Sequence, residues 1–377
     1  MKVYLDNAAT TPMDPEVIEA MIPVMKEQYG NPSSIHALGR KVRSTIEISR
    51  KQIAELLHVS PGEIIFTSGG TEADNMAICC TIEGLGVKHA ITSKIEHHAV
   101  LHCLQALEKK GMVQISYVTL QENGHIDLEH LEELLANNER SLVSLMEANN
   151  EIGTLTSLEA VGNICVKYDA IFHSDTVQTM AHYRMNLAEL PVHFVTCGAH
   201  KFHGPKGVGF LYCDSSIQLP PMIHGGSQER NMRAGTENVY GIVGMAKALE
   251  IAYREMEEHR EHVQGLKSYM IEQLEAKIPG VAFNGDAKGE SLYTVLNVCL
   301  PPSEKGDMLL FNLDIMGISA SGGSACSSGS DVGSHVIRNV NADPTRPSVR
   351  FSFSKFNKKE EIDYSISKLA EMMALEV

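Results

Sequence analysis

Residues 64–75, Ile-Ile-Phe-Thr-Ser-Gly-Gly-Thr-Glu-Ala-Asp-Asn, decide the fold because they join the first clear strand to a helix. The apolar run Ile64–Thr67 predicts a short buried strand, and the glycines after it predict a turn. We expect Thr71 to cap the helix that follows, with Asp74 reaching back to it. Free amide groups at such a turn suit a phosphate, although a helix that is merely capped shows the same pattern.

The same alternation of apolar strands and helices continues beyond this turn. Further strands are expected at 90–92, 115–118, 142–146, 170–174, 194–196 and 208–212, and helices at 99–109, 128–136 and 158–168. This order predicts an α/β fold in which helices cover both faces of a sheet, without fixing the order of the strands.

A change of pattern after the alternating region predicts a second, smaller domain. A long helical stretch at 242–274 is rich in Glu, His and Lys, and a mixture of strands and helices follows it. We place the boundary near residue 257. This gives a large domain at 13–257 and a small domain formed by 1–12 with 258–377.

The charge and composition exclude several classes of partner. Lys and Arg total 32 against 47 Asp and Glu, a formal net charge of −15, whereas binding to DNA needs clustered basic residues. No apolar run approaches the ~18 residues of a membrane span. Asp6 and Asn7 interrupt the only apolar opening, so we expect no secretory signal. The chain is therefore expected in the cytoplasm, with its thiols reduced.

One of the eight cysteines stands out from the others. No pair has CxxC spacing, which argues against a zinc ribbon or a thioredoxin-type motif, and no metal site is expected. Most cysteines are expected to be small buried residues. Cys326 instead lies in Ser-Gly-Gly-Ser-Ala-Cys-Ser-Ser-Gly at 321–329. A thiol in such a polar segment is a chemical hazard unless it is used, so Cys326 is predicted to be functional.

Two ionisable residues at the ends of predicted strands are candidates for chemistry. Lys201 follows the strand at 194–196 and precedes the glycine-rich turn at 204–209. At a buried site, desolvation would lower its pKa and free its amine as a nucleophile; the alternative is a surface lysine. Asp175 ends the strand at 170–174, where a buried acid needs a cationic partner unless it caps a helix.

With these segments in this order, the chain resembles the cysteine desulfurases of the NifS and IscS type, within the class V aminotransferases of pyridoxal phosphate fold type I. That resemblance implies a mixed, mostly parallel sheet with helices on both faces, together with a smaller α+β domain. The segment that contains Cys326 resembles the group with a long cysteine loop. The other matching segments are Tyr-Leu-Asp-Asn-Ala-Ala-Thr-Thr at 4–11, Gly-Asn-Pro-Ser-Ser at 30–34, the turn at 67–75, Glu-His-His at 96–98, Asn-Asn-Glu-Ile-Gly at 149–153, Arg-Ala-Gly-Thr at 233–236 and Ser-Val-Arg-Phe-Ser at 348–352.

The resemblance implies pyridoxal 5'-phosphate as the cofactor and suggests a role for each contact. Lys201 would carry the cofactor as an internal aldimine. Asp175 would keep its pyridine nitrogen protonated, which makes the ring an electron sink. Gln178 would contact the ring hydroxyl, and His97 would stack on the ring face and help to move protons. Gly70, Thr71 and His200 would hold the phosphate, together with Thr236 of the partner subunit. Asn150 is also implied as a cofactor-binding residue.

The resemblance also implies the substrate, L-cysteine, and the reaction. Arg350 would bind the substrate carboxylate through its planar fork, with Asn150 and Asn31 orienting that end. Lys201 would move the α-proton. The Cys326 thiolate would take the sulfur as a persulfide while alanine leaves. The implied partners are a second copy of the chain in a homodimer and a sulfur-acceptor protein, either an iron–sulfur scaffold or a tRNA-thiolation protein.

The chain departs from the family pattern beside the predicted cofactor lysine. Gly198 occupies the place of a serine whose hydroxyl would contact the phosphate, and Gly70 replaces the more usual alanine. The first change removes a hydrogen-bond donor, so we expect a weaker hold on the cofactor.

Three alternatives remain open at this point. A selenocysteine lyase would use the same cofactor on the selenium analogue of cysteine. Another class V enzyme without sulfur transfer would not need Cys326. A degenerate binding or scaffolding subunit would bind no cofactor, but the presence of both Lys201 and Asp175 speaks against it.

Overall fold

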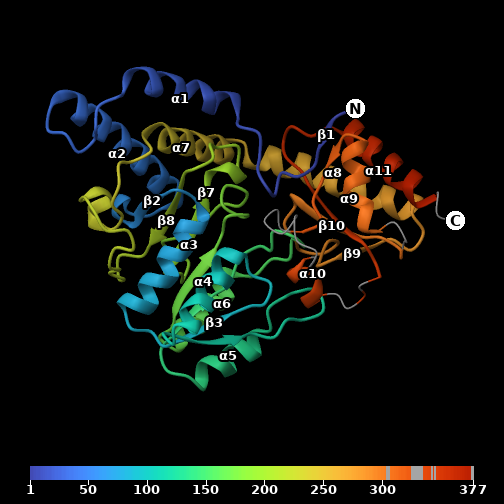
Figure 1. Ribbon diagram of the computed structural model, residues 1–377, viewed down its shortest axis with the longest axis horizontal. Coiled ribbons are helices and arrows are strands. Elements are labelled where there is room, and N and C mark those ends of the chain that lie inside the picture. The colour runs from blue at the N-terminus through green and yellow to red at the C-terminus, as the bar shows by residue number, and fades with distance from the viewer. Residues whose placement is uncertain (303–305, 324–333, 341–342, 344, 375–377) are drawn as a thin grey trace.

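The structure has two parts that lie side by side, each built on its own sheet (Figure 1). It is a computed structural model that describes residues 1–302, 306–323, 334–340, 343 and 345–374. The larger part has a seven-stranded sheet, and the smaller part has a three-stranded sheet. Among the described residues, no helix combines the length and the apolar character that crossing a membrane requires.

The seven-stranded sheet is mixed but mostly parallel. Its strands, in order across the sheet, are β2 (Ile64–Thr67), β8 (Gly209–Cys213), β7 (Phe194–Gly198), β6 (Ile171–Asp175), β5 (Ser141–Ser144), β3 (His89–Thr92) and β4 (Gln114–Tyr117). Strand β8 is antiparallel to both of its neighbours, and every other pair is parallel. Because β6 and β7 are parallel, Asp175 and Gly198 reach the same edge of the sheet. The predicted fold class is confirmed.

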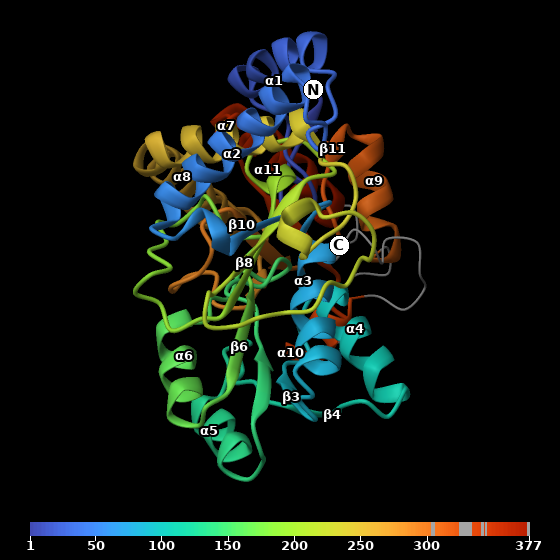
Figure 2. The ribbon, with the colours of Figure 1, turned by 90° about the vertical axis from the view of Figure 1, so that its left-hand side faces the viewer.

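Different helices cover the two faces of this sheet. The helices of the larger part are α1 (Pro15–Glu27), α2 (Ala37–Leu57), α3 (Gly70–Cys79), α4 (His98–Lys109), α5 (Leu128–Ala136), α6 (Leu158–Lys167) and α7 (Val239–Arg254). Along β2, Ile64 and Phe66 enter one core while Ile65 enters the other, as the period of two in a strand requires. Figure 2 shows α6 on one side of the central strands and α3 and α4 on the other.

The smaller part has a separate apolar core. Its elements are β1 (Val3–Tyr4), α8 (Met256–Lys277), β9 (Ala282–Asn284), β10 (Val295–Cys299), α9 (Leu309–Ile315), β11 (Ile318–Ser319), α10 (His335–Val340), β12 (Ser348–Ser352) and α11 (Lys359–Ala374). Strand β10 lies between β9 and β12 and is antiparallel to both. The N-terminal arm joins this part, because β1 pairs with β11 in parallel.

Short helical turns connect several of these elements. They are Pro61–Glu63, Cys80–Gly84, Ala199–Lys201, Gln228–Asn231 and Gly306–Met308, of which Cys80–Gly84 is a π-helical turn that continues α3.

The structure corrects two details of the sequence analysis. The helical stretch expected at 242–274 is two helices, because Glu255 leaves the helical conformation with φ −110° and ψ 12°. The expected cap by Thr71 and Asp74 is wrong. Helix α3 already begins at Gly70, its N-cap is Gly69 without a side-chain hydrogen bond, and Asp74 is buried at 1 % exposure. The division of the chain near residue 257 stays a prediction.

Candidate active site

A pocket lies where β6 and β7 reach the edge of the larger sheet. It leaves about 220 Å³ for the centres of water molecules, which is room for a small-molecule ligand. Its wall also includes Ala8 and Ala9 from the N-terminal arm. Nine residues proposed from the sequence line it: Gly70, Thr71, His97, Asn150, Asp175, Gln178, His200, Lys201 and Arg350.

Lys201 extends into this pocket from the turn that follows β7. Its Nζ atom donates hydrogen bonds to the carbonyl oxygens of Ala8 at 2.5 Å and Ala9 at 3.0 Å. The amide of Thr11 in turn donates to the carbonyl oxygen of His200 at 2.9 Å, so the arm and the turn are bound together. These contacts hold the amine inside the pocket.

Asp175 is a buried acid on the opposite strand of the β6–β7 pair. It is 7 % exposed and accepts the Val177 amide at 3.0 Å. Burial, followed by the nearby Asp74, raises the pKa of Asp175 to about 6. His173 lies 3.4 Å from Asp74 without hydrogen-bond geometry, and burial lowers its pKa to about 4, so it adds no positive charge. A protonated ring nitrogen in the pocket would supply the missing charge.

His97 lies beside this acid at the start of α4. Its Nδ1 accepts the Ala99 amide at 3.1 Å, which leaves Nε2 available to the pocket. Burial lowers the pKa of His97, so the ring is neutral near pH ~7. Atoms of His97, Asp74 and Asp175 that can bind a cation all lie within 4.8 Å of one another. A positively charged ring edge therefore fits this corner electrostatically.

The N-terminus of α3 forms an anion cradle at another end of the pocket. Gly69 offers no side chain to the first amides of the helix, and Gly70 and Thr71 line the pocket. His200 borders the same space; its Nδ1 lies 3.2 Å from Thr10 Oγ1, and burial lowers its pKa to about 4. Unsatisfied amides at a helix N-terminus are the groups that bind phosphate in many folds.

Gly198 leaves room next to this cradle. A Cβ atom at Gly198 would lie 3.5 Å from the Gly70 nitrogen, 3.7 Å from Val177 Cγ1 and 3.7 Å from His200 Cδ2, which are ordinary contacts. A serine side chain can therefore be accommodated at this position, beside the first amide of α3.

Arg350 supplies a buried guanidinium on β12. It is 1 % exposed, and its Nη1 and Nη2 donate to the Asn150 carbonyl oxygen at 2.9 Å and to Asp6 Oδ1 at 2.8 Å. Its Nε has no hydrogen-bond partner among the described residues. A buried donor without a partner is costly, and a ligand carboxylate would satisfy it.

Three predicted residues are not placed in this pocket by the single chain. Asn31 is exposed, and its Oδ1 accepts the Ser33 amide, as expected of a turn residue. Thr236 is exposed on the loop before α7. Cys326 lies outside the described residues.

The sequence analysis did not single out the groups that position this machinery. Asp6 orients Arg350, although it falls within the matching segment at 4–11. Arg50 and Glu229 form a buried bidentate ion pair, with both oxygens at 2.7 Å from the guanidinium. This pair holds a turn in which Glu229, Arg230 and Asn231 all have positive φ, just before the loop of Thr236. Sequence patterns give no signal for a pair 179 residues apart.

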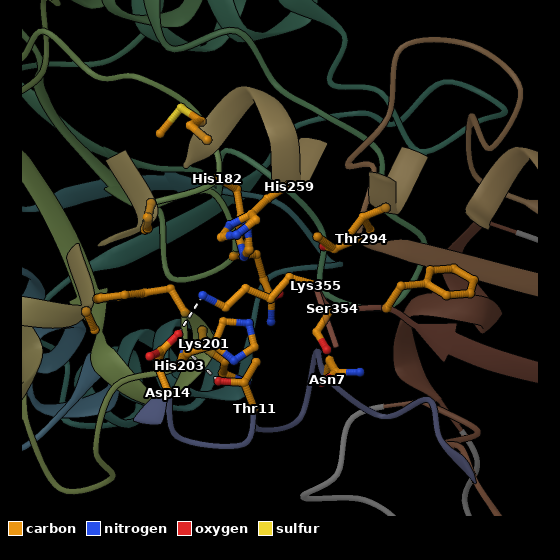
Figure 3. Close-up of a pocket in the computed structure, with 18 of the residues that line it drawn as sticks. Asn7, Thr11, Asp14, His182, Lys201, His203, His259, Thr294, Ser354 and Lys355 are labelled. Atoms are coloured by element: carbon orange, nitrogen blue, oxygen red, sulfur yellow. Dashed lines mark hydrogen bonds and ion pairs between the residues drawn. The ribbon is translucent and has the colours of Figure 1, made fainter. Parts of the chain in front are cut away.

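A second, much smaller pocket lies behind Lys201, at the junction of the two parts (Figure 3). It leaves about 30 Å³ for the centres of water molecules, which is room for about two waters and not for a cofactor. Lys355 binds Asp14 there at 2.6 Å. His182 Nδ1 lies 3.1 Å from the Tyr293 hydroxyl of the smaller part. The pocket thus contains polar contacts that join the two parts next to the lysine.

One pocket contains a lysine amine, a buried acid that lacks a cationic partner, and a helix N-terminus suited to an anion. This combination is typical of pyridoxal-phosphate-dependent enzymes with an α/β fold. The chain belongs to the aminotransferase class-V family, which matches residues 3–364. It is 44 % identical to "Cysteine desulfurase IscS" of Dictyoglomus turgidum, over 99 % of this chain and 94 % of that protein. It is 41 % identical to "Putative cysteine desulfurase IscS 1" of Bacillus subtilis, over 99 % of this chain and 98 % of that protein.

Solved structures give the same relationship. A NifS-like protein superposes with a TM-score of 0.92 at 38 % identity and full coverage of both chains. A structure described as SspA in complex with cysteine superposes with a TM-score of 0.82 at 29 % identity, over 95 % of this chain and all of that one. The fold and the family are therefore established together.

The residues present fit pyridoxal 5'-phosphate, the cofactor of this family. Asp175 would bind its ring nitrogen, the start of α3 would bind its phosphate, and Lys201 would bind its aldehyde. His97 and Gln178 border the space for the ring; Gln178 Nε2 donates to the Ala8 carbonyl oxygen at 3.0 Å, which leaves its second amide hydrogen free for a ligand.

Proposed function

We propose that this chain is a cysteine desulfurase, which converts L-cysteine to L-alanine and keeps the sulfur as a persulfide on Cys326. The bound cofactor supplies an electron-withdrawing ring that stabilises negative charge at the α-carbon of the substrate. Support comes from the relatives named cysteine desulfurase and from the similar structure described in complex with cysteine.

The observation that carries the proposal is the presence of Arg350 in the same pocket as Lys201 and Asp175. An amino-acid substrate needs a cation for its carboxylate, and Arg350 has a buried Nε donor without a partner. Asp6 fixes the guanidinium plane through Nη2. The substrate carboxylate then orients the α-carbon relative to the amine of Lys201.

The remaining residues divide the chemistry between them. The Lys201 amine is the group that takes and returns a proton at the substrate α-carbon. Neutral His97 presents its Nε2 beside Asp175 and moves protons at the face of the pocket. The Cys326 thiolate attacks the substrate sulfur and forms an S–S bond while the bond between that sulfur and the β-carbon breaks. The β-carbon keeps the bonding electron pair and takes up a proton, which makes the methyl group of alanine, and alanine leaves.

The direct test follows products and variants together. Purified protein loaded with cofactor should release alanine and sulfide in equal amounts from L-cysteine in the presence of a thiol reductant. Cys326→Ser should keep its cofactor and release no sulfide, while the matched control Cys165→Ser, a buried cysteine in α6, should behave as the unchanged protein. Normal sulfide release by Cys326→Ser would overturn the proposal.

We also propose a homodimer in which Thr236 of the partner subunit contacts the phosphate. Thr236 is exposed, and the loop that carries it is fixed by Arg233, whose Nε binds Glu72 Oε1 at 2.7 Å in the first turn of α3. Thr236→Ala should weaken cofactor binding without changing the pocket of its own chain. Full activity of a monomer in sedimentation at assay dilution would contradict this arrangement.

The persulfide calls for a protein acceptor, and we propose an iron–sulfur scaffold or a tRNA-thiolation protein in the cytoplasm. Both acceptor classes take sulfane sulfur from a cysteine loop. Labelled sulfur from L-cysteine should move from Cys326 to a cysteine of the acceptor, and failure to transfer to either class would remove this part of the proposal. Comparing the kinetics on L-cysteine with those on selenocysteine distinguishes this activity from that of a selenocysteine lyase.

A further inference from the structure

Two cysteines lie together away from the pocket, on the face of the sheet covered by α3 and α4. Cys79 is the last residue of α3, and Cys103 lies within α4. Their Sγ atoms are 3.4 Å apart, although the residues are 24 positions apart in the chain. The two helices pack against each other over the same apolar core. This contact is therefore built into the fold rather than into one flexible loop.

The two thiols have different environments. Cys79 is half-buried, and Cys103 is buried at 8 % exposure. The contact between the two thiols lowers the pKa of Cys79, against the opposing effects of burial and Glu83 and with a smaller contribution from Lys110, while the same contact and burial raise the pKa of Cys103. An accessible thiol with a lowered pKa next to a buried thiol is the arrangement in which oxidation at the first is resolved by the second.

The other described cysteines are less accessible than Cys79. All are buried, and burial raises the pKa values of most of them. The cysteines whose pKa is raised by burial are Cys80, Cys165, Cys197 and Cys213. Cys79 is therefore the described cysteine best placed to react with a small oxidant.

We propose that Cys79 and Cys103 form a peroxide-sensitive dithiol that closes to a disulfide between α3 and α4. The Cys79 thiolate attacks one oxygen of a hydroperoxide; the O–O bond breaks, and Cys79 becomes a sulfenic acid while hydroxide or alkoxide leaves. Cys103 then attacks that sulfur, the S–O bond breaks, and water leaves as the S–S bond forms. The two thiols lose two electrons in total, and the peroxide gains them.

The position of the pair defines what the disulfide would do. Helix α3 starts at Gly70 and α4 follows His97, so both helices present residues to the pocket from their N-termini. The Cys79–Cys103 contact lies one or more turns away from those ends. The bond would tie the two helices to each other without occupying the pocket, and a thiol reductant would release it.

Intact-mass analysis of the full-length holoenzyme tests the proposal directly. We use Cys326→Ser protein, which removes the reactive thiol of the loop, and treat it with about one equivalent of hydrogen peroxide per chain before alkylation under denaturing conditions. The expected result is a mass loss of two hydrogens, two fewer alkylated cysteines and one cross-linked peptide that joins the segments of Cys79 and Cys103. Dithiothreitol should restore both thiols.

Matched variants in the same background identify the residues. Cys103→Ser should form no disulfide and instead give a sulfenic acid on Cys79 that dimedone traps. Cys165→Ser should still form the disulfide. The proposal is wrong if both thiols remain alkylated after peroxide treatment, or if the mass loss persists in Cys103→Ser, or if the cross-linked peptide joins Cys79 to Cys80 or Cys80 to Cys213.

Discussion

Replacing Gly198 with serine should tighten cofactor binding. Gly198 lies at the end of β7 with φ −132° and ψ 113°, a backbone conformation that serine adopts without strain. Its added Cβ would make contacts of 3.5 Å or longer, so no neighbour has to move. The new hydroxyl would lie beside the first amide of α3 and could donate to the same phosphate.

The size of the effect follows from the worth of one hydrogen bond. A bond to a charged group contributes about 1.5–3 kcal/mol, and 1.4 kcal/mol corresponds to a factor of ten in affinity. In the proposed site the phosphate would already have the helix amides, Thr71 and His200 as partners, so the lower end of this range applies. We expect Gly198→Ser to bind the cofactor about tenfold more tightly.

Titration of the apo-proteins with pyridoxal 5'-phosphate, followed by absorbance, measures this change. Gly198→Ala is the matched control, because it adds the Cβ without the hydroxyl and should bind as the unchanged protein does. Equal affinities for glycine and serine would show that water or a neighbouring side chain already fills the gap. Equal tightening by alanine and serine would assign the effect to packing, and the reasoning from the hydroxyl would be refuted.

Three further changes probe the scaffold of the site. Glu229→Gln should destabilise the protein by about 3–5 kcal/mol in urea unfolding, because it removes the buried negative charge paired with Arg50 and leaves only the half-exposed Glu47 at 3.3 Å as an anionic partner. Burial raises the pKa of Glu96 to about 8, above its unfolded value of about 4.3, so its contribution to stability is lost as pH rises between those values; Glu96→Gln should flatten this loss. Asp6→Asn should raise the KM for cysteine roughly tenfold, because a neutral amide oxygen holds the orientation of the Arg350 guanidinium less firmly than the carboxylate does.

Each of these three has its own control. The control for Glu229→Gln is Lys51→Ala, which removes an exposed ion pair with Glu55. This control should lower the free energy of unfolding by less than about 1 kcal/mol. The pH series compares urea unfolding of both apo-proteins at the same pH values between about 6.5 and 8; the histidines and the other buried acids titrate in both proteins, so the difference between the two slopes reports Glu96. An unchanged slope in Glu96→Gln would contradict the assignment. For Asp6→Asn, cofactor content should stay constant, and a loss of cofactor instead of a rise in KM would show that Asp6 supports the fold.

The sequence was sufficient for the sheet and for most of the pocket, because strand ends and glycine turns are local signals. Lys201 and Asp175 both follow apolar strands, and the parallel pairing of β6 and β7 then brings them to one edge. The start of α3 was predicted less well. At that helix start, glycines take the place of a side-chain cap. Tertiary packing buries Asp74 near Asp175, and no local sequence pattern predicts this.

The contacts between distant segments could not be read from the sequence. Asp6 meets Arg350 across 344 positions, and Arg50 meets Glu229 across 179. Such pairs depend on how the two parts pack, for which hydrophobic periodicity carries no information. The cysteine pair of α3 and α4 is a further example, because only the packing of the helices brings the two sulfur atoms together.

The central claim is that Lys201 holds pyridoxal 5'-phosphate in this pocket, and borohydride reduction of the holoenzyme tests it most directly. Reduction fixes the cofactor to the lysine that bears it, and peptide mapping by mass spectrometry then identifies that residue. The account predicts a phosphopyridoxyl group on Lys201 and none on the exposed control Lys206, together with loss of the visible absorption band in Lys201→Ala. A label on any other lysine, or a visible band that survives in Lys201→Ala, would contradict it.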